Sequence, residues 1–557
     1  MSEQESSYTR CIALVLIALG IFVYANTFNS DFIWDDASSV LLHQTVQDPS
    51  SVLILFTEDQ HAYAGGQGNF YRPLLAVTFM IDFWLSNNGP TIHESTEVVN
   101  TLSPLLFHID SLIWHCMAAL FFMLILQNLK APILIQALVP MLYIVHPLHT
   151  EAVSYISGRA DSMSATFIFA GLFFAIRSKS WLNIVLVVLC YIAGLLSKES
   201  SLIFPGLLVL TLYAHNKIES QKWDKQQLVA IVASVATFAT YGVLRSVGPL
   251  NFGSDSQAPT NSFGYRIAET LQSFAYYMEL LFSPSNLHME RTLVQATSTT
   301  TILGLLSLVV VLGITLFSFK KKEHRILLGS LWFLLTWLPI SGIFPLNAPM
   351  AEHWMYVPMA GFLWALLELC LCVIPNTAGD TLKLKLRNAF VGFSIIWLIF
   401  LSLNSVERNV AWSSNNHIYS ATLSENPKST RVHYNLAVTY QDLENNPIGA
   451  KRHYNQILGV YAKKKAQNLS QKDTFWDEEI QSHYSLAQIY FTEQNYAEAS
   501  KHFNTLAKLN PSGNNRSIVG RSMYGLGQCL LKTGRQQQAQ TLFEQAFKIA
   551  PELASKG

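Results

Sequence analysis

The sequence predicts an all-α protein in which a multispanning membrane domain is followed by an α-helical repeat domain. Half of the 557 residues are hydrophobic and only 13% are charged, about half the charged fraction of an ordinary soluble protein. This bias ends near residue 404, and the polar remainder carries small and aromatic residues at a regular interval. We therefore expect one domain at 1–404 and a second at 405–557.

Eleven apolar segments of the first domain are candidate membrane spans. A helix needs roughly 17 to 25 residues to cross a ~30 Å hydrocarbon core. The segments lie near residues 11–26, 104–127, 131–146, 161–176, 181–197, 201–213, 227–244, 301–319, 326–342, 354–374 and 389–404. We interpret the first as a retained anchor and not a cleaved leader, because its start is poor in charge and no small-residue cleavage pattern follows.

The lysines and arginines predict which side each loop faces. Eleven spans place the chain ends on opposite sides, and cytoplasmic loops carry most of the basic residues. With the N-terminus inside, the inner segments hold fourteen basic residues in about 50 positions and the outer segments hold six in about 161. The six are Arg72, Arg159, Lys198, Arg245, Arg266 and Arg291. We therefore expect a cytoplasmic N-terminus, long outer loops at 27–103 and 245–300, and an extracytoplasmic repeat domain.

An amphipathic segment lies inside the second outer loop. Its apolar residues recur every three or four positions, at Ile267, Leu271, Phe274, Met278 and Leu281. This period is typical of a helix with one apolar face. We interpret the segment as a packing helix in the membrane interface.

The polar domain repeats a pattern that matches the tetratricopeptide repeat (TPR), in which small residues let two antiparallel helices close and larger ones fill the gap. One copy has Leu486, Ala487, Tyr490, Ala499, Phe503 and Pro511. The next has Leu526, Gly527, Leu530, Ala539, Phe543, Ala546 and Pro551. A more divergent copy has Leu436, Ala437, Tyr440, Ala450 and Tyr454. The sequence therefore predicts a TPR α-solenoid with repeats near 431–460, 480–513 and 520–553.

Charge and cysteine content exclude several classes of function. The 37 basic residues balance 37 acidic ones, so no excess charge attracts nucleic acid. Five of the six cysteines lie in or beside apolar segments, where a thiol behaves as a small hydrophobe. Neither a disulfide framework nor a metal site is predicted, and no cofactor is expected, although a divalent cation remains an option.

Two adjacent acids open the first outer loop. Asp35 and Asp36 follow Trp34 shortly after the first predicted span. Neighbouring carboxylates repel, so one becomes a better proton acceptor or the pair meets a cation. The alternative for this segment alone is a solvated turn with a helix-capping acid.

Four more segments place ionisable residues at the outer ends of spans. They contain Tyr71 and Arg72; His146, His149 and Glu151; Arg159 and Asp161; and Lys198 and Glu199. Such groups usually line a cavity or pair with one another, and Arg and Lys are natural phosphate ligands. Singly, each has a plainer explanation, such as snorkelling of a long side chain or a satisfied loop histidine. Together they predict a phosphate pocket that faces the two acids.

These segments resemble a known family, the transmembrane and TPR-containing O-mannosyltransferases. The resemblance rests on Phe32-Ile33-Trp34-Asp35-Asp36, Tyr71-Arg72-Pro73-Leu74, the run from His146 to Val153, Gly158-Arg159-Ala160-Asp161 and Leu196-Ser197-Lys198-Glu199, followed by the TPRs. It covers nearly the whole chain, which departs from the family in its small number of repeats. It implies a GT-C fold that transfers a sugar, expected to be mannose, from a polyprenyl or dolichyl phosphate to Ser or Thr hydroxyls. The membrane would be that of the endoplasmic reticulum in a eukaryote, or the inner or plasma membrane in a bacterium.

The resemblance also implies roles for the candidate residues. Asp35 or Asp36 would accept the proton of the acceptor hydroxyl during one inverting displacement. The donor phosphate would be stabilised by Arg72, His146, His149, Arg159 and Lys198. Supporting residues would be Trp34, Tyr71, Glu151, Asp161 and Glu199. The TPR array would hold the acceptor protein.

Two other classes of function stay open at this stage. A membrane-anchored TPR scaffold without catalysis would tolerate replacement of Asp35 and Asp36 by asparagine. A transporter would fit the many spans and charged residues. Against a transporter, the polar motifs gather at one face and not at the bilayer midplane.

Overall fold

The computed structural model of the chain describes residues 3–60, 70–86, 102–177, 180–246, 263–291, 293, 297–344, 346, 348–374, 380–467, 475–510 and 515–553. All regular structure in these ranges is helical. The chain divides into two compact units, Met1–Ile418 and Tyr419–Gly557. The division falls after the predicted boundary at 404 because α16 (Asp380–Ala411) continues beyond its apolar portion. Pro511 of the second predicted repeat lies outside the described residues.

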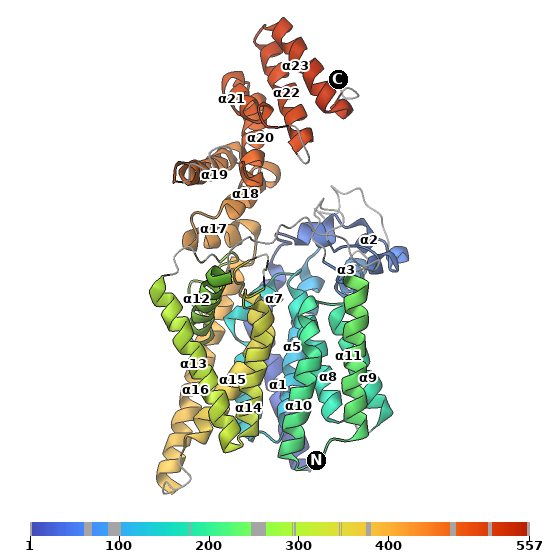
Figure 1. Ribbon diagram of the computed structural model, residues 1–557, viewed down its shortest axis with the longest axis vertical. Helices are drawn as coiled ribbons and strands as arrows, with labels where there is room; N and C mark the ends of the chain where they lie inside the picture. Colours follow the sequence, from blue (N-terminus) through green and yellow to red (C-terminus); the bar gives the residue numbers. More distant parts are fainter. Residues whose placement is uncertain are drawn as a thin grey trace. The chain divides into compact units, whose positions relative to one another are not determined.

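The first unit is a helical bundle with short helices at one end (Figure 1). Besides α16, its helices are α1 (Glu3–Tyr24), α2 (Gln44–Gln47), α3 (Pro73–Ser86), α5 (Leu105–Asn128), α6 (Ile133–Ile144), α7 (Thr150–Ser154), α8 (Arg159–Ile176), α9 (Trp181–Leu195), α10 (Phe204–Ile218), α11 (Lys225–Ser246), α12 (Phe263–Phe282), α13 (Ser298–Lys321), α14 (His324–Trp337), α15 (Tyr356–Cys372) and α17 (Asn415–Glu425). The N-terminus lies at the opposite end of the bundle from α2, α3 and α7. The segments predicted to face outward therefore share one end.

Every predicted span falls on a helix, but the number eleven is not confirmed. Seven described helices are long and apolar enough to cross a membrane, and up to eight if one bent pair forms a single span. The bent pair joins α6 to Pro147–Ser154 with a 52° bend. Three other predicted spans fall on helices of only 14 or 15 residues, namely α9, α10 and α14. The predicted interfacial helix at 267–281 is α12.

The bundle core is built from large aromatic residues and close helix crossings. Phe122, Phe169 and Trp332 pack together from α5, α8 and α14. Helices α14 and α15 approach most closely at Gly361, where an added Cβ would lie 2.6 Å from the Gly329 carbonyl oxygen. Small residues allow such crossings in lipid, where water does not drive helices together. Residues such as Leu316 on α13 remain exposed on the face expected to meet lipid.

The described residues of the second unit form three pairs of helices, as predicted for TPRs. They are α18 (Thr430–Val438) with α19 (Pro447–Gln467), α20 (Asp477–Thr492) with α21 (Tyr496–Ala507), and α22 (Asn515–Lys532) with α23 (Gln536–Ile549). The small residue of the motif matters sterically in the third pair. A Cβ added to Gly527 would lie 2.7 Å from the Phe543 ring, so a larger residue here would force this ring to shift. The TPR α-solenoid predicted from the sequence is confirmed.

Acid is expected to destabilise the second unit. Burial, followed by the partner imidazole, lowers the pKa of His453 and of His483 to about 4. Because an unfolded histidine titrates near 6.5, the unfolded chain binds more protons in acid. The stability that the two neutral histidines contribute to the folded unit is therefore complete above about pH 6.5 and is lost as the pH falls toward 4.

Thermal unfolding measured between pH 7.5 and 4.5 should show the midpoint of this unit falling with pH. Replacement of one histidine pair, His483→Met with His502→Leu, should reduce the fall. Arg452, Lys465, Lys501 and Glu498 also act on these histidines and are kept in the variant. An unchanged pH dependence would show that the pair does not cause it.

Candidate active site

The Asp36 side chain links the loop that follows α1 to the segment around Ser157 by hydrogen bonds. The carboxylate is fully buried. Its Oδ1 accepts hydrogen bonds from the Ser157 backbone N–H at 2.8 Å and hydroxyl at 2.6 Å, and its Oδ2 accepts from the Ile33 N–H at 3.0 Å. Burial raises the pKa of Asp36 to about 7, against the effect of these hydrogen bonds. Asp36 therefore joins two distant segments and does not cap the helix that follows it.

Asp35 occupies a different environment because the backbone turns sharply before it. Trp34 has a φ of +49°, which is a strained conformation for a bulky residue and costs roughly 1–3 kcal/mol. The Trp34 N–H donates to the Asn415 side-chain oxygen at 2.9 Å, which holds this turn. Asp36 is buried, whereas Asp35 is only partly buried. Of the two acids, Asp35 is thus the one accessible to a substrate.

Three aromatic rings from distant segments form a stack beside Asp35. Trp34 stacks on Tyr155 and Tyr155 stacks on Trp412, each with ring centroids 5.6 Å apart. Burial raises the pKa of Tyr155 well above its ordinary value, and the charges of Asp35 and Asp36 add to the effect. The phenol therefore stays neutral. The Arg408 guanidinium lies 5.4 Å from the Trp412 ring centroid, at the far end of the stack.

The predicted cations Arg72 and Lys198 are each paired with an acid, and Arg72 lies within electrostatic range of Tyr155 in this stack. Arg72 Nη2 lies 2.9 Å from Glu199, and Lys198 Nζ lies 2.6 Å from Asp161. Burial alone would lower the pKa of Arg72, but the Glu199 carboxylate outweighs it and the pKa is raised, with smaller contributions from Asp161 and Tyr155. The structure thus joins the segment of Arg72 to that of Glu199 and the segment of Lys198 to that of Asp161, while a phosphate pocket stays a prediction.

Three other predicted phosphate ligands are buried in structural contacts. Arg159 is fully buried and binds Asp82 at 2.6 Å and Asp110 at 2.8 Å. His146 Nε2 contacts the Leu281 carbonyl oxygen at 3.2 Å, and His149 Nδ1 contacts the Tyr143 carbonyl oxygen at 2.8 Å. These partners do not favour a phosphate role for Arg159 and His146, whereas the buried Nε2 of His149 has no hydrogen-bond partner within the described residues. The predicted supporting residue Tyr71 donates to the Phe56 carbonyl oxygen.

A second charged cluster was missed by the sequence analysis. Glu352 is buried and accepts from the His288 N–H at 2.7 Å, Arg291 at 3.2 Å and Arg408 at 3.5 Å. Burial raises the pKa of Glu352, although Arg408 and Arg291 oppose the shift. The Nε of Arg408, also buried, has no hydrogen-bond partner within the described residues. The sequence offered one hint, since Arg291 was among the six unexpected outer cations.

The cluster extends to a predicted supporting residue. Glu151 lies 2.7 Å from His353 Nδ1 and also accepts from the His353 N–H. Charged groups from four distant segments therefore surround one end of the aromatic stack. Among the residues that the structure describes, no group of three or more His, Cys, Asp or Glu side chains is arranged to hold a metal ion.

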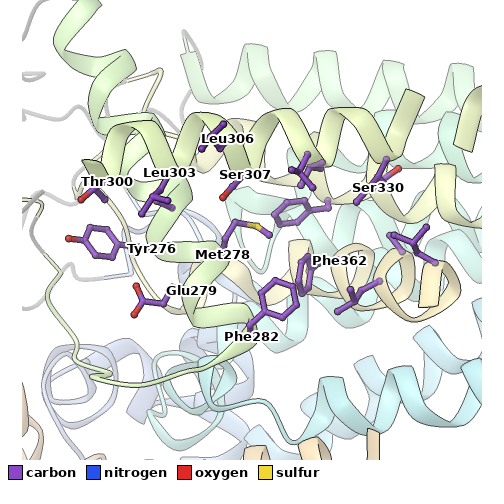
Figure 2. A pocket seen from close by; sticks show the side chains of 18 residues that line it. Tyr276, Met278, Glu279, Phe282, Thr300, Leu303, Leu306, Ser307, Ser330 and Phe362 are labelled. Carbon is purple, nitrogen blue, oxygen red and sulfur yellow. The ribbon is translucent and has the colours of Figure 1, made fainter. Parts of the chain in front are cut away.

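An apolar cavity of about 710 Å³ lies between α12, α13, α14 and α15. Leu306, Val310, Phe333, Phe362 and Leu366 are among its lining residues. Figure 2 shows Tyr276, Glu279 and Thr300 gathered at one end and mostly apolar side chains, with Ser307 and Ser330 among them, along the rest. The lining includes one acid and no base. Such a cavity suits a hydrocarbon chain and not a phosphate.

The fold and site define a helical membrane protein with a charged, aromatic-lined layer at one end of its bundle and a separate TPR unit. A tetratricopeptide repeat family model matches residues 478–552. A protein O-mannosyl-transferase of Caenorhabditis elegans is 26% identical over 464 residues, which cover 80% of this chain and 62% of that protein. Human TMTC3, also named a protein O-mannosyl-transferase, is 24% identical over 76% of this chain and 48% of its own length.

The chain is thus a relative of the protein O-mannosyl-transferases, which confirms the resemblance found in its motifs. It spans about half to two thirds of the length of these relatives. Among solved structures, an oligosaccharyltransferase of Archaeoglobus fulgidus aligns with a TM-score of 0.38 and 12% identity, over 82% of this chain and 60% of that one.

Proposed function

We propose that this protein is a glycosyltransferase that moves a sugar, mannose by analogy with its relatives, from a polyprenyl-phosphate carrier to Ser or Thr hydroxyls of proteins. The reaction takes place on the non-cytoplasmic side of the membrane, with the N-terminus cytoplasmic. The observation that carries the proposal is the position of Asp35, which is only partly buried and lies beside the aromatic stack. The TPR unit holds the acceptor protein.

In the proposed mechanism Asp35 is the general base. It takes the proton of the acceptor hydroxyl as the hydroxyl oxygen attacks the anomeric carbon. The bond from that carbon to the phosphate oxygen breaks, the configuration inverts, and the lipid phosphate leaves with the electron pair. Asp36 is unsuited to this role because both of its oxygens are engaged in a buried loop contact. No metal or other cofactor takes part in this scheme.

The cations of the site stabilise the charge that grows on the leaving phosphate. Arg408 is the strongest candidate, because it is buried near the stack and its Nε lacks a partner within the described residues. Arg291 shares Glu352 with it. Arg72 and Lys198 lie near the same layer, where their acids hold them in position.

The apolar cavity supports a lipid-linked donor, and filling it should weaken binding of a long carrier chain. Ser307 lines the cavity, and the larger side chain of Ser307→Trp would occupy space that the carrier chain fills. If it displaces about two methylenes of a long-chain donor from the cavity, KM for that donor should rise about tenfold. KM for a short-chain donor should stay unchanged. Leu316→Trp is the matched control, since Leu316 is an exposed residue of the same helix. Equal effects of both variants would argue against the cavity.

The function itself is tested by transfer of radiolabelled mannose. Purified protein is incubated with polyprenyl-phosphate mannose and a mixed protein extract, and label released from protein by alkaline β-elimination is counted. Label on Ser or Thr would support the proposal. No label from any of several lipid-linked sugars would favour the non-catalytic TPR scaffold.

A further inference from the structure

The first two TPRs each contain a pair of facing histidines. In the first, the Nδ1 atoms of His433 and His453 are 2.9 Å apart; in the second, those of His483 and His502 are 2.8 Å apart. In each pair one histidine comes from the first helix of the repeat and the other from the second. The same arrangement therefore occurs twice.

The two pairs occupy equivalent positions of the repeat. His433 and His483 each lie three residues before the motif leucine of the first helix. His453 and His502 each come directly before the large aromatic residue of the second helix. In the third repeat the equivalent residues are Met523 and Leu542, both partly buried.

The third repeat shows that the helix pair closes with apolar side chains at these positions. Packing alone thus does not require histidine in the first two repeats. Burying a polar group costs free energy unless it gains a hydrogen bond or another partner. We therefore look for a chemical role of the two histidine pairs.

The surroundings of the imidazoles prepare a nitrogen atom for a ligand. His433 Nε2 contacts the Pro427 carbonyl oxygen at 3.2 Å, which places the ring proton on Nε2 and leaves the Nδ1 lone pair directed at His453. Metal-binding histidines commonly donate their second nitrogen to a carbonyl in this way. Tyr440 stacks on His453, and Tyr490 stacks on His502, which orients the second ring of each pair.

Access and nearby charge are compatible with a cation. His453, His483 and His502 are only partly buried. Two of the nearby lysines are neutralised by acids, since Lys465 pairs with Glu479 and Lys501 with Glu498.

We propose that each histidine pair binds a borderline divalent transition-metal ion of the Zn²⁺ class between its two Nδ1 atoms, and that this ion links the two helices of its repeat. The proton shared by these atoms moves to the Nε2 of the ring that carried it, so both imidazoles stay neutral. A Zn–N bond is about 2.0–2.1 Å, so tetrahedral coordination places two nitrogens roughly 3.3 Å apart. The imidazoles must therefore separate by about half an ångström. Water completes the coordination, since no third His, Cys, Asp or Glu within the described residues joins either pair in a group arranged to hold a metal ion. This site is independent of the proposed sugar transfer.

The test is the number of Zn²⁺ ions bound by the full-length protein, purified without a histidine tag and titrated by calorimetry at pH 7.5. Wild type should bind about two ions per chain and should melt at a higher temperature with Zn²⁺ but not with Mg²⁺, because a ligand of the folded state stabilises it. His483→Met with His502→Leu should bind about one. Adding His433→Met with His453→Leu should leave none. These substitutions copy the third repeat.

A gain of binding tests the proposal without the loss of any histidine. Met523→His with Leu542→His should create a third site, raising the number of ions bound by about one. Binding should weaken as the pH falls through the imidazole range, because protons compete for the ligand atoms. Absence of Zn²⁺ binding by wild type up to millimolar concentration would overturn the proposal, as would an unchanged stoichiometry in the variant that lacks all four histidines.

Discussion

Asp35→Asn is expected to abolish sugar transfer while the protein stays folded. The amide keeps the size of the carboxylate but cannot accept the proton of the acceptor hydroxyl, and loss of a general base typically costs a factor of about 10²–10⁴ in rate. The measurement is kcat for mannose transfer from polyprenyl-phosphate mannose, with thermal unfolding of the same preparation. We expect kcat to fall and KM for the donor to stay the same, because donor binding does not involve this proton transfer.

Asp36→Asn is the matched control for Asp35→Asn, because it makes the same change at the neighbouring position. Asp36 accepts hydrogen bonds on both oxygens. An asparagine amide has one acceptor oxygen, so its NH₂ group must face either the Ile33 N–H or the Ser157 donors. A buried donor left unsatisfied costs about 1–3 kcal/mol. This variant should therefore melt earlier. Full turnover in a folded Asp35→Asn protein would show that Asp35 is not the base.

Much of the fold could be predicted because it depends on local patterns. Apolar runs marked the seven described helices that are long and apolar enough to cross a membrane, and the three-to-four spacing from Ile267 to Leu281 marked α12. The number of spans stays a prediction, because hydropathy alone does not show whether the 14- and 15-residue helices α9, α10 and α14 cross the membrane. It also does not show bends: the chain turns by 52° between α6 and Pro147–Ser154.

Site residues could be predicted from the sequence only where both members of an ion pair lie in recognisable motifs. Arg72 with Glu199 and Lys198 with Asp161 were all singled out from the sequence, although their pairing was not. The two acids that pair with Arg159, Asp82 and Asp110, were not predicted as site residues because they lie within otherwise apolar helices. Glu352 and Arg408 are 56 residues apart, and only the folded bundle brings them together.

Arg159 is predicted from its motif to bind the donor phosphate, whereas its buried ion pairs support a structural role, and a substitution can distinguish the two. Arg159→Met keeps the bulk of the side chain but leaves Asp82 and Asp110 without their cation in the bundle interior. Breaking a buried ion pair by removing one partner costs about 3–5 kcal/mol. We therefore expect a large loss of thermal stability, seen as a lower melting temperature in detergent and a smaller monodisperse peak on size exclusion.

Removing the stranded acids distinguishes a structural role of Arg159 from a catalytic one. Asp82→Asn with Asp110→Asn, combined with Arg159→Met, leaves no unpaired charge and should recover much of the lost stability, since replacing a buried ionic group by neutral residues is often close to neutral. A structural Arg159 then predicts that transfer activity recovers with the fold. A refolded triple variant that stays inactive, or an Arg159→Met protein that melts like wild type yet transfers no sugar, would restore the phosphate role predicted from the motif.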